Sequence, residues 1–291
     1  MSNLFSRIGL VSALTMVSRF LGLARDVLTS AVFGASIWHS AFVTAFMIPN
    51  LFRRLLGEGA LTAALMPGLS EELKEGGREG VFKLVNKTLS WLLVICAGLC
   101  VLAYLVFSYV QVHSESEKWI LGGTLGKTLF PYILPICLAA IISAALNLLG
   151  KFGVPALTAV WLNSSMIAFL GLGGWLLGGE EREKMILLCI GTMLGGALQL
   201  VAPAWALARE GWRPRFDLGL SERVKMVAAL TLPGVFGASV HQINVVVTRG
   251  LAFDLSEAGA TLIYLANRLV ELPVGVFAIA ISTVVFPSLS K

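Results

Sequence analysis

The strongest constraint on this chain is a succession of long apolar runs separated by short polar segments. Each run is long enough to cross a hydrocarbon core of about 30 Å as a helix. Only 13% of the residues are charged, whereas soluble domains carry about 25%, so the chain cannot cover a surface in water. The sequence therefore predicts an all-α, polytopic helical membrane protein, and it excludes soluble enzymes, nucleic-acid modules, disulfide scaffolds and disordered tails. The eight expected spans are residues 8–34, 38–69, 88–110, 128–149, 154–178, 185–208, 226–253 and 259–289.

Basic residues outside the runs are divided unevenly between the two sides of the membrane. One set of segments consists of the N-terminus, the connections after the second, fourth and sixth spans, and the C-terminus, and it holds twelve of the 22 Lys and Arg residues. The connections on the opposite side hold four. Cytoplasmic segments concentrate Lys and Arg. We therefore expect both termini on the cytoplasmic side. The first span, which Arg19, Arg25 and Asp26 interrupt, is expected to be retained and not cleaved as a signal peptide.

Ionisable residues inside the spans carry a surplus of positive charge. Each such group costs at least about 2.5–3.5 kcal/mol at membrane depth, so it normally pairs or faces a cavity. Three acidic residues cannot neutralise six arginines, and the surplus predicts a water-filled cavity that attracts an anion. The arginines are Arg19, Arg25, Arg53, Arg54, Arg249 and Arg268, and the acidic residues are Asp26, Glu58 and Glu271.

The first span carries two polar pairs on one face. Ser18–Arg19 and Arg25–Asp26 are seven residues apart, close to two helical turns. Arg25 lies about 27 Å along a continuous helix from Arg7, which is too far for both to anchor one membrane surface. We expect Arg19 and Arg25 to line the cavity and to contact a substrate, with Ser18 and Asp26 as supporting polar residues.

The second span places Asn50, Arg53, Arg54 and Glu58 after Pro49, which removes a backbone donor and loosens the helix. Arg54 and Glu58, at i and i+4, form the expected structural ion pair. That pairing leaves the fork of Arg53 to bind a phosphate with two hydrogen bonds. Asn50 and Glu58 are the supporting polar residues of this span.

The last two spans each carry one arginine. Arg268 and Glu271, at i and i+3, fit a self-contained ion pair as well as a cavity role, and spacing alone leaves both open. Arg249 lies near Asp254 and Glu257, a placement typical of an interfacial anchor.

Other motifs predict packing and not chemistry. Gly122–Thr128 resembles a phosphate-binding loop, but Leu121 stands where the first glycine belongs and no strand precedes it. Gly191–Gly195 has the spacing of a helix-packing seam. Cys96 and Cys100 have no His or further Cys beside them and are expected to be buried apolar residues. The sequence predicts no catalytic residue, no metal site and no cofactor.

Several segments, taken in order, resemble the MurJ/MviN family of lipid II flippases. They are Thr15–Asp26, Phe46–Arg54, Glu58–Ala60, Phe130–Leu134, Asn267–Val276 and Phe286–Ser290. The resemblance implies the MATE-like fold of the multidrug/oligosaccharidyl-lipid/polysaccharide exporter superfamily, with two helical lobes around a cavity that opens alternately to each side. It also implies that Arg19, Arg25, Arg53 and Arg268 contact the substrate.

A weak internal repeat supports a six-helix unit. Pro67 and Pro287 lie in similar short segments near the ends of the second and eighth spans, and each span carries Asn, Arg and Glu in that order. We therefore expect residues 1–210 to form a six-helix lobe, 211–225 a basic cytoplasmic linker, and 226–291 the first two helices of an incomplete second lobe. On this division, the chain needs further helices, in cis or from a second polypeptide, to flip a lipid.

The surplus of arginine and the resemblance predict the same function. We expect a flippase of peptidoglycan and cell wall biogenesis, and hence of cell shape. It would move the undecaprenyl-pyrophosphate-linked head group of lipid II to the outer leaflet of the bacterial cytoplasmic (inner) membrane, with no enzymatic step and no nucleic-acid partner. The alternatives are a MATE-like small-molecule exporter, an exporter of another polyprenyl-pyrophosphate saccharide, and a membrane assembly factor that transports nothing. A cationic-drug exporter would require an acidic cavity, and an assembly factor would not need arginines at membrane depth.

Overall fold

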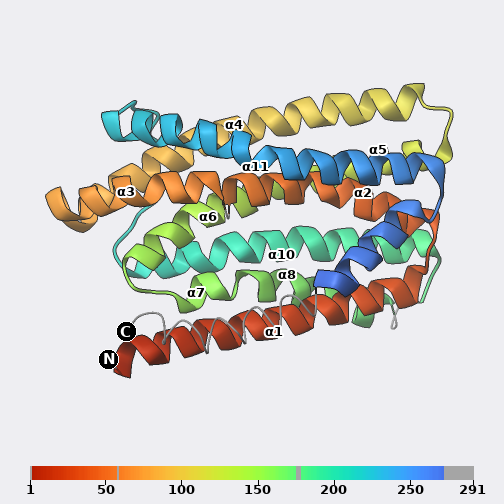
Figure 1. Ribbon diagram of the computed structural model, residues 1–291, viewed down its shortest axis with the longest axis horizontal. Coiled ribbons are helices and arrows are strands. Elements are labelled where there is room, and N and C mark those ends of the chain that lie inside the picture. Colours follow the sequence, from red (N-terminus) through yellow and green to blue (C-terminus); the bar gives the residue numbers. More distant parts are fainter. Residues whose placement is uncertain (1, 58, 175–177, 272–291) are drawn as a thin grey trace.

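The computed structural model describes residues 2–57, 59–174 and 178–271, which are helical over most of their length. The helices lie side by side along the long axis, and the chain passes repeatedly between the two ends of the bundle (Figure 1). In chain order they are α1 (Ser2–Phe33), α2 (Ile37–Phe52), η1 (Arg53–Gly57), α3 (Ala60–Glu75), α4 (Gly77–His113), α5 (Glu117–Leu129), η2 (Phe130–Tyr132), α6 (Ile133–Leu148), α7 (Gly153–Ala156), α8 (Thr158–Ile167), η3 (Ala168–Gly173), α10 (Glu181–Arg209) and α11 (Glu222–Leu255). Residues 259–271 form a final helical segment.

Five helical stretches of the described chain are long and apolar enough to cross a membrane. They are Gly77–His113, Glu117–Leu148, Gly153–Gly173, Glu181–Arg209 and Glu222–Leu255. The other three expected spans are also helical where the structure describes them. However, α1 carries charges, η1 separates α2 from α3, and the last span is described only to residue 271. The protein is a polytopic helical membrane protein, and eight spans remain a prediction.

The second expected span is two helices and not one. The chain stays helical through Pro49 to Phe52, then widens into the π-helical turn η1 before α3 begins at Ala60. The backbone N–H of Arg53 donates to the carbonyl oxygens of both Pro49 and Asn50, a shared hydrogen bond that marks the end of α2. A π-turn of this kind often lies at a functional site, and here it carries Arg53 and Arg54.

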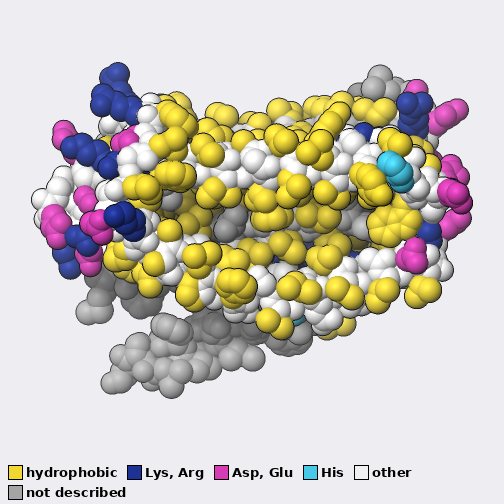
Figure 2. Space-filling model, turned by 90° about the horizontal axis from the view of Figure 1, so that it is seen from above, with side chains coloured by type: hydrophobic (Ala, Val, Ile, Leu, Met, Phe, Trp, Pro, Cys, Tyr) yellow, Lys and Arg dark blue, Asp and Glu magenta, His cyan; other side chains and the backbone are white. Residues whose placement is uncertain are grey.

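Charged side chains gather at both ends of the bundle, and apolar side chains cover much of the face between them that Figure 2 shows. The α3–α4, α6–α7 and α10–α11 connections share one end with the start of α1, which we call the linker end (Figure 1). The α1–α2 and α4–α5 connections lie at the opposite end. This distribution matches a bilayer whose hydrocarbon core surrounds the middle of the bundle, because charge there is costly.

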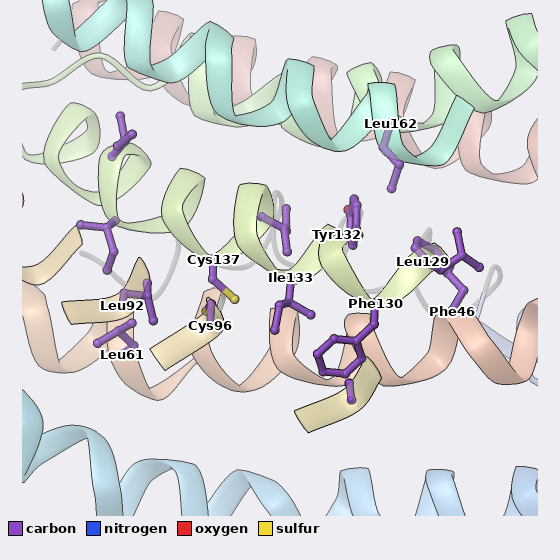
Figure 3. Close-up of a cluster of buried hydrophobic side chains, with 14 of the residues drawn as sticks. Phe46, Leu61, Leu92, Cys96, Leu129, Phe130, Tyr132, Ile133, Cys137 and Leu162 are labelled. Atoms are coloured by element: carbon purple, nitrogen blue, oxygen red, sulfur yellow. The ribbon is translucent and has the colours of Figure 1, made fainter. Parts of the chain in front are cut away.

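The apolar core lies around the stretch from α5 to α6. In the most apolar 18 residues of Glu117–Leu148, 67% of the residues are buried, so this stretch is central. In the most apolar 18 residues of Glu222–Leu255, 6% are buried, so α11 is peripheral. Phe46 of α2 packs on Tyr132 of η2, with ring centroids 5.3 Å apart, and Cys96 and Cys137 lie together between α4 and α6 (Figure 3).

The expected glycine seam joins α8 to α10. A Cβ atom on Gly195 would lie 2.9 Å from Cα of Leu162, and one on Gly191 would lie 3.0 Å from the carbonyl oxygen of Ser165. Only glycine therefore allows the two backbones to come this close. The P-loop-like segment Gly122–Thr128 forms part of α5 and is no loop.

The last helices are attached to the earlier ones near both ends. At the linker end α11 packs on α3, where Arg223 forms ion pairs with Glu71 and Glu75. At the opposite end the hydroxyl groups of Ser40 on α2 and Thr261 lie 3.0 Å apart, and both residues are buried. The middle of the interface between these contacts is open to a cavity.

Candidate functional site: an arginine-lined cavity

A cavity of about 730 Å³ lies between α1, α2, η1 and α8 on one side and α11 and residues 259–271 on the other. All six arginines expected at membrane depth line it: Arg19, Arg25, Arg53, Arg54, Arg249 and Arg268. The acidic residues among its described lining are Asp26 and Glu271. The positive surplus seen in the sequence is therefore concentrated in one place.

Asp26 of α1 holds two of these arginines together. Its Oδ1 accepts hydrogen bonds from Arg25 Nε at 2.9 Å and Nη2 at 2.5 Å, and its Oδ2 accepts one from Arg268 Nε at 2.7 Å. The hydroxyl of Tyr264 donates to the same Oδ1 at 2.8 Å. Arg268 also reaches Glu271, but at 3.5 Å, so the contact with Asp26 on another helix is the closer of its two ion pairs.

Two further residues fix the position of this cluster. Asn163 of α8 accepts a hydrogen bond from Arg25 Nη1 at 3.0 Å and donates one to the carbonyl oxygen of Ser18 at 3.3 Å. Gly22 of α1 makes room for Arg268, because a Cβ atom there would lie 2.9 Å from Arg268 Nη2. A larger residue at position 22 would require the guanidinium group of Arg268 to shift.

The π-turn η1 presents two further arginines to the cavity. Arg53 donates through Nε to Oδ1 of Asn50 at 3.3 Å, so Asn50 orients Arg53 from the preceding turn. Arg54 is exposed and lines the cavity beside it. Glu58, the expected partner of Arg54, lies outside the described residues. Arg19 is exposed on α1 and lines the cavity without a hydrogen bond or ion pair to the described residues.

The interpretation of Arg249 as an interfacial anchor is wrong. Its side chain lines the cavity, and its guanidinium carbon lies 5.3 Å from the centroid of the Tyr264 ring. The neighbouring Asp254 faces a different way and accepts a hydrogen bond from Trp119 Nε1 at 3.1 Å. His241 is exposed and also lines the cavity.

Sequence reasoning missed Tyr264 and Asn163. Asn163 is the single amide side chain in an uncharged span, which is a signal that could have found it. Tyr264 has no such signal, because an aromatic residue in a span is usually a packing residue. Its role depends on the hydroxyl group reaching α1, which only the tertiary structure shows.

The arrangement suits an anion that several elements bind together. Guanidinium groups converge from α1, η1, α11 and residues 259–271, and arginine binds phosphate oxygens in pairs. Neutral hydrogen-bonding groups, including Gln199, Gln242 and Asn244, line the same cavity and are suited to an uncharged polar group.

Known proteins resemble this chain over nearly its whole length. The family model "Lipid II flippase MurJ" matches residues 29–291. The lipid II flippase MurJ of Burkholderia cenocepacia is 32% identical over 99% of this chain and 57% of its own length. The probable lipid II flippase MurJ of Vibrio cholerae is 34% identical over 97% of this chain and 56% of its own. This chain thus spans a little over half the length of these relatives.

A solved structure shares the fold. A MOP superfamily transporter from Pyrococcus furiosus superposes with a TM-score of 0.67 over 91% of this chain and 60% of its own, at 14% sequence identity. At this identity the likeness concerns the fold alone. The match of the family model over most of the chain decides the classification: this chain belongs to the lipid II flippase MurJ family.

Proposed function

We propose that this chain forms the pyrophosphate-binding part of a lipid II flippase of the bacterial cytoplasmic membrane. It would carry the undecaprenyl-pyrophosphate-linked head group from the cytoplasmic to the outer leaflet by alternating access. Residues 1–210 would act as one lobe, 211–225 as the cytoplasmic linker and 226–291 as the beginning of a second lobe. The pyrophosphate would be moved and not hydrolysed, so we do not propose an enzyme.

The convergence of six arginines on one cavity carries this proposal. A pyrophosphate attached to a lipid cannot cross hydrocarbon unaided, because an uncompensated charge at membrane depth is strongly unfavourable. In the proposal Arg19, Arg25, Arg53 and Arg268 contact the pyrophosphate, while Ser18, Asp26, Asn50, Glu58 and Glu271 support them. A MATE-like exporter of cationic molecules is disfavoured by the same observation, because its cavity would repel its cargo.

Binding by the chain in lipid nanodiscs tests the proposal. Lipid II should bind, whereas undecaprenol, which has the same tail without phosphate, should not. Replacing Arg25 and Arg53 together by Ala should abolish lipid II binding. Arg209→Ala, which changes an arginine stacked on Trp205 outside the cavity, should have no effect. Equal binding of undecaprenol, or full binding by the double variant, would overturn the proposal.

A further inference from the structure

Arg249 of α11 is incompletely bonded. Its Nε is buried and has no hydrogen-bond partner among the described residues. The guanidinium group lies over the face of Tyr264, which stabilises the positive charge but does not satisfy an N–H at the edge of the group. A buried donor without an acceptor is unfavourable, so the side chain is suited to an acceptor that is not part of the described protein.

The nearby charges do not supply that acceptor. Arg54 of η1 is close enough to repel Arg249, and Glu271 attracts it but is bonded to Arg268. Asp26 already accepts from Arg25, Tyr264 and Arg268. Two like charges that face one cavity inside a low-dielectric protein and membrane favour an anion between or beside them.

Arg249 is also connected to the cluster on α1. Its guanidinium group stacks on the ring whose hydroxyl accepts a hydrogen bond from Arg25 Nη2 at 3.1 Å. An anion in contact with Arg249 would therefore lie beside the groups that Asp26 holds together. A pyrophosphate carries more negative charge and more oxygen atoms than a single phosphate, so it is better suited to contact arginines on several helices at once.

We propose that Arg249 is a further anion-binding residue of the cavity, which donates from α11 to a pyrophosphate group that Arg25 and Arg268 contact from α1 and from residues 259–271. This inference rests on the proposed function and adds a specificity: Arg249 favours a pyrophosphate over a monophosphate.

The test uses the whole chain in nanodiscs of zwitterionic phosphatidylcholine, so that no anionic lipid competes. The probes are farnesyl pyrophosphate, farnesyl monophosphate and inorganic pyrophosphate, and the last shows whether the lipid tail contributes to binding. Arg249→Ala should weaken farnesyl pyrophosphate binding by about 10- to 150-fold, the loss of one charge-assisted hydrogen bond. It should weaken monophosphate binding much less. Arg249→Lys, which keeps the charge without the fork, should fall between.

Two controls separate binding from a structural role. Arg209→Ala removes an arginine that is also stacked on an aromatic ring, but outside the cavity, and should leave all three affinities unchanged. Without ligand, Arg249→Ala should change the melting temperature little, because the loss of the contact with the Tyr264 ring is offset by the removal of a buried N–H that has no acceptor among the described residues. A lower melting temperature with unchanged affinities would mean that Arg249 is structural, and the inference would be wrong. Unchanged binding by Arg249→Ala overturns this inference alone, whereas failure of the unmodified chain to bind any pyrophosphate would also overturn the proposed function.

Discussion

The arginines of the cavity differ in how the protein holds them. Arg25 and Arg268 share one carboxylate, Arg53 is oriented by an amide, and Arg19 is exposed. The side chain of Asp26 is only 6% exposed. Because removing one partner of a buried ion pair leaves an uncompensated charge, Asp26 is the residue on which the geometry of the cluster most depends.

Asp26→Asn should therefore destabilise the protein and make its stability depend on ligand. Loss of the carboxylate should cost about 3 kcal/mol, the low end for a buried pair, since Arg268 is partly exposed. Saturating farnesyl pyrophosphate should restore part of the decrease in melting temperature, because its phosphates supply an anion in place of the missing carboxylate. Asp254→Asn, at the exposed end of α11, should change little. An unchanged melting temperature for Asp26→Asn would mean that the cluster does not stabilise the helices.

Lipid II binding should require the planar guanidinium group of Arg53 as well as its positive charge. Arg53→Lys keeps the charge but loses the planar donors and the contact with Asn50, so it should weaken lipid II binding nearly as much as Arg53→Ala, by about 10- to 150-fold. The measurement is lipid II affinity in nanodiscs at equal protein abundance. A lysine variant with full affinity would show that only charge is needed at this position.

At the scale of the elements, the segment between α10 and α11 is attached to α4 and is not a loose tether. Asn86 of α4 accepts hydrogen bonds from Trp212 Nε1 at 2.9 Å and from the backbone N–H of Arg215 at 3.3 Å, and it donates to the carbonyl oxygen of Arg213 at 3.0 Å. Ser90 accepts one more from the backbone. Beside them, a hydrogen bond from Lys151, helped by its charge and that of Arg78, lowers the pKa of Glu210. Glu210 is therefore ionised at neutral pH and pairs with Arg78 and Lys151.

Asn86→Ala should release this segment. Three hydrogen bonds of about 1 kcal/mol each are lost, so trypsin should cleave after the exposed Arg215 up to about 150-fold faster under native conditions. Ser90→Ala should have a smaller effect. Thr88→Ala, which removes a bond only within α4, is the matched control and should have none. An unchanged cleavage rate in Asn86→Ala would mean that Trp212, which is buried, holds the segment by packing alone.

At the scale of the whole molecule, the charged ends and the apolar middle fix how the bundle fits a bilayer, and the basic bias predicts which end is cytoplasmic. The exposed residues Glu115 and Glu180 lie in connections at the opposite end, and the exposed residues Glu79 and Arg215 lie at the linker end.

Cysteine labelling of intact cells tests that orientation. Cysteines at Glu115 and Glu180 should react with a membrane-impermeant maleimide, and cysteines at Glu79 and Arg215 should react only after the membrane is opened. The unmodified chain reports the background from its own cysteines. Reversed labelling at two of these sites would mean that the termini face the outside.

The amino-acid sequence by itself determined the helical class and the gathering of arginines around a cavity, but not the ends of the helices, since α4 begins at Gly77 and α5 at Glu117, well before the expected spans. The class and the cavity follow from local properties, since apolar length sets a span and an unpaired arginine at membrane depth requires water or a partner. Only the tertiary structure decided which groups meet. Helical periodicity places Arg25 and Asp26 on a face of α1, but it does not say which helix that face meets. The approach of Arg268, more than 240 residues along the chain, is therefore absent from any local pattern. For the same reason the sequence pattern around Arg249, with two carboxylates nearby, indicated an anchor, whereas the packing of α11 on α3 and α2 makes Arg249 a cavity residue.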